Sequence, residues 1–240
     1  MISNCPGAQR FRQPEPEAMK CPHCGRELEI WTDEPKTECP ACKNTVTRKD
    51  GQSCLDWCRY AKDCVGADIF GKYMKNRSVT IRQKLLEGLE EYFGDDKKRI
   101  DHAKRVMDVA EELLKRLRGD WHIVIPASIL HDAGIKAAEA KYGSVSNEQQ
   151  EIEGAEIAKK FLLKIGLRKG DIEEICDIIA HHHTPGAIDT VNFRILYDAD
   201  SIVNLKERMA GKEPEEVMSA IEKQLLTKAG KEAAEDLYLK

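Results

Sequence analysis

The sequence predicts a mainly α-helical protein with a small cysteine-rich module at its N-terminus. Eight of the nine cysteines lie between Cys5 and Cys64. From about residue 77, cysteine and proline become rare, and apolar residues recur at the helical steps of three and four. No part of this second region alternates polar and apolar residues over the length of a strand. We therefore expect a metal-binding module over residues 1–76 and a helical domain over residues 77–240.

Composition and charge limit the class of protein. The chain has 240 residues, of which 41% are hydrophobic and 33% charged, as in a globular protein with a core. A net charge of −4 gives no electrostatic argument for binding nucleic acid or an anionic membrane. The sequence has no apolar run of about 18 residues that would span a bilayer. Its first residues, "MISNCPGAQR", lack the apolar segment of a secretory signal. We expect a cytoplasmic location.

The first metal signal is a pair of C-x2-C motifs, Cys21–Cys24 and Cys39–Cys42. Four thiolates from two tight turns form a tetrahedral site of the kind that zinc favours. The intervening sequence contains a short alternating run typical of a β-hairpin. The pattern resembles a zinc ribbon over approximately residues 19–48. Because so small a segment has little core of its own, we expect a structural zinc ion there.

A second cysteine group lies close by and consists of Cys5, Cys54, Cys58 and Cys64. If the segment is helical, Cys54 and Cys58 lie on one face at i and i+4. Cys5 would then complete a site for a second zinc ion or an iron–sulfur cluster. The alternative is that these cysteines are small apolar residues packed on a helix.

The helical region carries histidine and aspartate at helix ends or beside apolar helix positions. A buried imidazole beside a carboxylate is costly unless something binds both. A divalent metal does so, and mixed imidazole and carboxylate ligation suits Mn, Fe, Co, Ni or Zn better than calcium. The candidate residues are His102, His131, Asp132, His181, His182, His183, Asp198 and Asp200.

The order of these residues resembles the HD-domain metal-dependent phosphohydrolase superfamily over approximately residues 77–205. The segments that carry the resemblance are "RIDHAKRV", "ILHDAGI", "IIAHHHTP" and "DADSIVNL". The resemblance implies an HD-type helical bundle that binds a divalent transition metal. The ligands that it implies are His102, His131, Asp132 and Asp200. Asp200 is favoured because "ADSI" matches the family's Ala-Asp-x-hydrophobic pattern, and Asp198 remains its competitor.

The resemblance also implies groups that meet a phosphate. Lys136, just after the His–Asp pair, is a candidate cation, and Lys141 is a second one. With one metal, His181 and His182 would contact the phosphate or hold the water.

Whether the site holds one metal or two is open. Binuclear relatives carry another histidine about four residues before a glycine on the following helix, and they use a His–His pair as later ligands. Gln150 lies nearest to that histidine's position here. Glu151 or Glu153 could replace the histidine as a ligand or general base, or both could lie on an exposed acidic face.

The function implied by the resemblance is that of an enzyme. A metal-activated water would hydrolyse a phosphomonoester or phosphodiester, for example of a nucleotide. The expected partner is this small phosphorylated substrate, and neither a membrane nor nucleic acid is expected. Two alternatives stay open. One is an HD-type di-iron oxygenase, and the other is a non-enzymatic nucleotide-sensing protein whose zinc module contacts a partner or nucleic acid.

Overall fold

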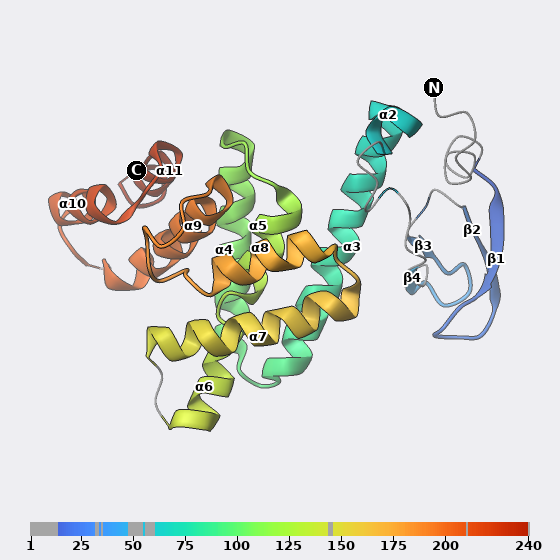
Figure 1. Ribbon diagram of the computed structural model, residues 1–240, viewed down its shortest axis with the longest axis horizontal. Helices are drawn as coiled ribbons and strands as arrows, with labels where there is room; N and C mark the ends of the chain where they lie inside the picture. Colours follow the sequence, from blue (N-terminus) through green and yellow to red (C-terminus); the bar gives the residue numbers. More distant parts are fainter. Residues whose placement is uncertain are drawn as a thin grey trace. The chain divides into compact units, whose positions relative to one another are not determined.

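The structure is a computed structural model that describes residues 14–31, 34, 36–47, 55, 61–143, 146–209 and 211–239. It divides into two compact units, Met1–Gln83 and Lys84–Lys240, which are described separately below (Figure 1). The boundary expected after residue 76 falls inside helix α3 (Ala67–Phe93), which continues from the first unit into the second.

The first unit contains two antiparallel hairpins (Figure 1). Strand β1 (Pro16–Lys20) pairs with β2 (Glu27–Trp31), and β3 (Lys36–Glu38) pairs with β4 (Thr45–Thr47). Because side chains alternate along a strand, β2 directs Leu28 and Ile30 inward and leaves Trp31 exposed. Their small core consists of Cys21, Leu28, Ile30, Cys39 and Val46.

The rest of the described chain is helical, which confirms the mainly α prediction. Helix α2 (Ala61–Val65) and the start of α3 lie in the first unit. The second unit continues with α4 (Lys97–Arg116), α5 (Trp121–Leu130), α6 (Gly134–Tyr142), α7 (Asn147–Ile165), α8 (Lys169–Ile179), α9 (Val191–Arg208), α10 (Pro214–Gln224) and α11 (Lys228–Tyr238). No helix in the described part of the chain is long and apolar enough to cross a bilayer.

Helix α4 follows the predicted apolar stripe. Its buried residues are Ile100, Ala103, Val106, Met107, Ala110, Leu113 and Leu114. The helix is capped by Asp96, whose side chain accepts the backbone N–H of Arg99 (3.3 Å). The stripe packs α4 against α5 and α9, which directs His102 toward both neighbours.

Helix α5 is buried along almost its whole length. Asp120 caps the helix by accepting the backbone N–H of His122 (2.8 Å), so α5 starts at Trp121 and Pro126 lies in its interior. The apolar helix delivers His131 to the centre of the unit as the residue that ends α5.

Helices α6 and α7 cross at two glycines. A Cβ atom on Gly134 would collide with the carbonyl oxygen of Gln150 and with the backbone of Gly154. Only glycine therefore permits so close an approach of the two backbones. The crossing sets Gln150 of α7 beside Asp132, which lies just before α6.

Candidate metal centre

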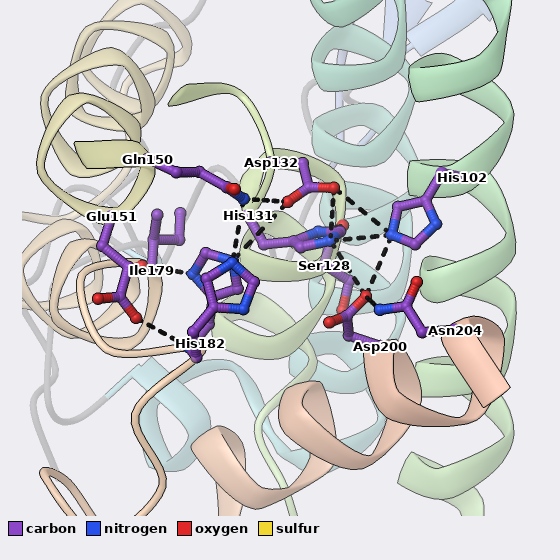
Figure 2. Close-up of polar contacts among 11 residues, drawn as sticks. His102, Ser128, His131, Asp132, Gln150, Glu151, Ile179, His182, Asp200 and Asn204 are labelled. Carbon is purple, nitrogen blue, oxygen red and sulfur yellow. Dashed lines mark hydrogen bonds and ion pairs between the residues drawn. The ribbon is translucent and has the colours of Figure 1, made fainter. Parts of the chain in front are cut away.

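Four predicted ligands converge from three parts of the helical unit (Figure 2). His102 comes from α4, His131 and Asp132 from the turn after α5, and Asp200 from α9. The His102 Nε2 atom lies 3.1 Å from Asp200 Oδ1, 3.3 Å from His131 Nε2 and 3.5 Å from Asp132 Oδ2. The His131 Nε2 atom lies 3.5 Å from Asp132 Oδ2 and 3.6 Å from Asp200 Oδ1. All four residues thus point one donor atom at a common centre.

The fully buried His131 is oriented by a backbone carbonyl. Its Nδ1 donates to the carbonyl oxygen of Ser128 (2.9 Å), which leaves Nε2 facing the carboxylates. A carbonyl that accepts one ring nitrogen while the other faces a metal is the usual arrangement of a histidine ligand. Sequence reasoning missed the role of Ser128, because a carbonyl acceptor carries no residue-type signal.

The electrostatics of the cluster favour a cation. Burial alone would lower the pKa of His131, but the carboxylates of Asp132 and Asp200 outweigh it and raise that pKa to about 9. Burial alone would raise the pKa values of both carboxyls, but the neighbouring imidazoles hold both below the usual range. Two carboxylates, of which Asp200 is buried and Asp132 partly buried, face two imidazoles and fit a divalent transition metal as their common partner.

Asn204 supports the cluster from one turn further along α9. Its Nδ2 donates to Asp200 Oδ1 (2.9 Å) and so fixes the carboxylate against His102. Sequence reasoning missed this residue. The available signal was an amide at i+4 from a candidate ligand on one helix, a spacing at which side chains meet.

Asp198, the competing ligand, is engaged elsewhere. Its carboxylate accepts the backbone N–H groups of Leu226 (2.7 Å) and Thr227 (2.9 Å) and the hydroxyl of Thr227 (2.6 Å). It therefore ties α9 to the start of α11, and a Cβ atom on Gly230 would collide with it. The structure brings Asp200, not Asp198, to the other three predicted ligands.

A second group of potential donors shares Asp132 and contains His182 and His183. His182 Nδ1 donates to the carbonyl oxygen of Ile179 (2.7 Å), and its Nε2 lies 3.7 Å from Asp132 Oδ1. Gln150 Nε2 donates to the same Asp132 oxygen and lies 3.4 Å from His182 Nε2. Figure 2 shows Gln150 and His182 on the side of Asp132 away from His102.

Glu151 and Glu153 make other contacts. The buried Glu151 accepts the backbone N–H of His183 through Oε1 (2.8 Å), so it holds the turn that carries the histidines. Glu153 accepts from Lys141 Nζ (2.6 Å) and from the Tyr142 hydroxyl (3.1 Å). These contacts describe a positioning role for Glu151 and a surface cluster around Glu153.

Two further predicted residues point to other partners. His181 Nδ1 donates to the carbonyl oxygen of Asp177 (2.8 Å), and its side chain is 37% exposed. Lys136 Nζ donates to the carbonyl oxygen of Tyr92 (2.6 Å) and lies over the Tyr92 ring. Of the three consecutive histidines, His182 and His183 belong to the donor group that contains Asp132, and His181 does not.

The predicted cysteine site in the first unit is also assembled. The sulfur atoms of Cys21 and Cys42 are 3.7 Å apart, as are those of Cys24 and Cys39. Four thiolates on a tetrahedral zinc ion, with Zn–S near 2.3 Å, are spaced about 3.8 Å apart, so the group fits zinc. A hydrogen bond from the Cys42 backbone N–H is the main reason why the pKa of Cys39 falls to about 6, whereas the pKa of Cys24 is raised, because burial and the three other thiols outweigh a hydrogen bond from the Arg26 backbone.

The two cysteine turns repeat one backbone pattern. The N–H of Cys21 bonds the carbonyl of Arg26, and that of Cys39 bonds the carbonyl of Asn44 (2.8 and 2.9 Å). The residue after each motif, Gly25 and Lys43, has a positive φ. The two turns bring the four sulfur atoms within 4.8 Å of one another.

The second cysteine group is not tested by the structure. Cys5, Cys54 and Cys58 lie outside the described residues. Cys64 lies in α2, but its side chain is not described. A second zinc ion or an iron–sulfur cluster there remains a prediction.

Comparison with known proteins identifies the helical region. The family model of the HD domain matches residues 99–205. A crystal structure of a predicted HD superfamily hydrolase from an uncultured Thermotogales bacterium is similar at 28% sequence identity, over 65% of this chain and 84% of that one, with a TM-score of 0.49. A search of curated proteins found no significant match. Residues 99–205 therefore match the HD domain.

Proposed function

We propose that this chain is a metal-dependent phosphohydrolase that acts on a phosphomonoester or phosphodiester, for example of a nucleotide. The observation that carries the proposal is the convergence of His102, His131, Asp132 and Asp200 within the HD domain. These four residues would hold the divalent metal. When bound there, the metal would supply Lewis acidity toward a phosphoryl oxygen and a water of lowered pKa.

The chain's own residues prepare this site before any substrate arrives. The Ser128 carbonyl orients His131, and Asn204 fixes the Asp200 carboxylate. Because these groups lie on packed helices or in the short turn between α5 and α6, the ligands need little rearrangement to bind the metal.

His182 is the proposed proton-handling or phosphate-binding group. The Ile179 carbonyl accepts its Nδ1–H, so the lone pair of a neutral His182 is on Nε2, beside Asp132. That atom can accept a proton from a water or donate one to an oxygen of the substrate. Glu151 positions His182 indirectly by holding the backbone of the next residue, His183.

The experiment is a hydrolysis screen of purified protein with Mn²⁺, Co²⁺ or Ni²⁺ against phosphomonoesters, phosphodiesters and nucleotides. Asp132→Ala should reduce the activity more than about 100-fold. The loss of a residue that only hydrogen-bonds to a metal ligand already reduces metal affinity or activity about 10- to 100-fold. The matched control is Asp189→Ala, because Asp189 pairs with Arg194 on the surface. Full activity in metal-free Asp132→Ala would contradict the site, and no activity toward any of these substrates would contradict the function.

We also propose that Cys21, Cys24, Cys39 and Cys42 bind one structural zinc ion. The support is the 3.7 Å spacing of the sulfur pairs and the burial of Cys21 and Cys39 in the small core. The ion would stabilise the hairpins without taking part in hydrolysis.

A further inference from the structure

The side chain of Gln150 lies between two acceptors in the second donor group (Figure 2). Its amide nitrogen donates to Asp132 Oδ1 and lies 3.4 Å from His182 Nε2. His182 Nε2 is an acceptor because Nδ1 donates to the Ile179 carbonyl. The two neighbours therefore fix the orientation of the amide, with its NH2 group toward both of them.

The same two acceptors belong to a group that could hold a cation. One ligand atom from each of Asp132, His182 and His183 lies within 4.8 Å of the others. The buried Nε2 atom of His183 has no hydrogen-bond partner among the described residues. A divalent ion bound here would share Asp132 with the metal held by His102, His131 and Asp200.

We propose that Gln150 restricts the HD domain to a single metal ion. Its NH2 group donates to the Asp132 oxygen and lies beside the His182 nitrogen, where a second cation would otherwise bind. The amide carries no net charge, so it replaces the contacts of an ion without its Lewis acidity. This inference rests on the proposed metal centre, and it names Gln150 as the residue that sets the number of metals there.

The backbone holds this amide in place. Gln150 is buried, and the Gly134–Gly154 crossing brings its own carbonyl against α6. The neighbouring Gln149 faces the other way and accepts the backbone N–H of Ser146 (3.1 Å) as part of the helix cap. The amide of Gln150 is therefore a fixed part of the site and not a mobile surface group.

One metal also limits the chemistry. A di-iron oxygenase needs a second iron at bridging distance from the first. With Gln150 donating to the shared aspartate, a second iron would have to displace that amide. The inference thus separates the proposed hydrolase from the oxygenase alternative.

The test counts Mn²⁺ bound to the metal-depleted full-length protein by electron paramagnetic resonance. Mn²⁺ binds well to imidazole and carboxylate donors and only weakly to the four thiolates. The wild type should bind one uncoupled ion. Gln150→Glu replaces the donating amide with a carboxylate ligand and should bind two ions, spin-coupled through Asp132.

The matched control is Gln149→Glu, which adds the same charge to the adjacent residue and keeps the acceptor that caps the helix. It should bind one ion. If Gln150→Glu fails to fold, Gln150→His supplies an imidazole ligand at the same position and should also bind two.

The outcomes separate the inference from the function on which it rests. Two coupled ions in the wild type, or a single ion in folded Gln150→Glu and Gln150→His, would overturn the role of Gln150 and leave the proposed hydrolase standing. An ion count that His131→Ala does not lower would contradict the metal centre, and the inference would fall with it.

Discussion

The two candidate metal sites are built in opposite ways. In the hairpin unit the sulfur atoms that meet come from residues as close as 15 and 21 positions apart, on two tight turns. In the helical unit His102 meets Asp200 across 98 positions, and the ligands depend on the packing of α4, α5 and α9. In the first case a bound metal would complete the fold, and in the second the fold assembles the candidate metal site.

The cores of the two units show the same contrast. Cys21 and Cys39 are themselves part of the small hairpin core, together with Leu28, Ile30 and Val46. The helical unit has a large core with many fully buried leucines and isoleucines, and of the four predicted ligands only His131 is fully buried with them. Loss of metal should therefore unfold the hairpins and leave the helices folded.

Removal of one thiolate should give the largest structural effect. We expect Cys39→Ser to release about one zinc ion and to remove most of the binding free energy, about 10–16 kcal/mol for structural zinc in small domains, that keeps the hairpins folded. Amide hydrogen exchange should show lost protection in β1–β4 and unchanged protection in α4–α9. Unchanged zinc content, or lost protection in both units, would contradict the claim that the metal stabilises the hairpins alone.

Removal of a supporting group in the helical unit should give an intermediate effect. Asn204→Leu removes the donor to Asp200 Oδ1 while keeping a side chain of similar size. We expect metal affinity at the HD site to fall about 10- to 100-fold, with unchanged helicity. Isothermal titration with Mn²⁺ measures this, and unchanged affinity would show that packing alone orients Asp200.

The pH dependence should have opposite signs for stability and for metal binding. The pKa of His131 is raised from 6.5 to about 9 in the metal-free protein, so its protonated form stabilises the fold. That contribution is complete below pH 6.5 and is lost as the pH rises through about 9.

Metal affinity should rise over the same range, by up to about tenfold per pH unit, because one proton leaves His131 for each ion bound. Denaturant titrations of metal-free protein and metal titrations at several pH values check the two trends. Parallel trends would contradict the assignment of His131 as a ligand.

Lys136 should show the smallest effect. Its ammonium group donates to the Tyr92 carbonyl, and it would reach a phosphate only by giving up that contact. We expect Lys136→Ala to change metal affinity and KM by less than about twofold, the size of ordinary surface substitutions. A KM increase well beyond this, with unchanged metal affinity, would show that Lys136 moves to bind the substrate phosphate.

What the sequence predicted follows the same contrast. The spacing of the cysteines predicts their site directly, because each pair lies in one turn. The helical ligands were predicted from their order along the chain, and the structure brings all four together. The direction of the three histidines could not be predicted, because α8 ends at Ile179 and helical periodicity ends with it.

The supporting residues were harder to predict for a physical reason. The contacts of Gln150 depend on the Gly134–Gly154 crossing, which joins segments of different helices. Asp198 and Asp200 lie two residues apart on α9. The docking of α11 engages the carboxylate of Asp198 and leaves Asp200 as the candidate ligand. Tertiary packing decides these roles, and residue type alone does not.

Metal analysis of the wild type beside His131→Ala and Cys39→Ser tests the central claim most directly. The full-length proteins would be purified anaerobically and their zinc, iron, manganese, cobalt and nickel contents compared. We predict that Cys39→Ser loses about one zinc ion and keeps the HD-site metal, whereas His131→Ala keeps that zinc and loses the other metal. Loss of both metals in either variant, or no loss in His131→Ala, would contradict two independent sites.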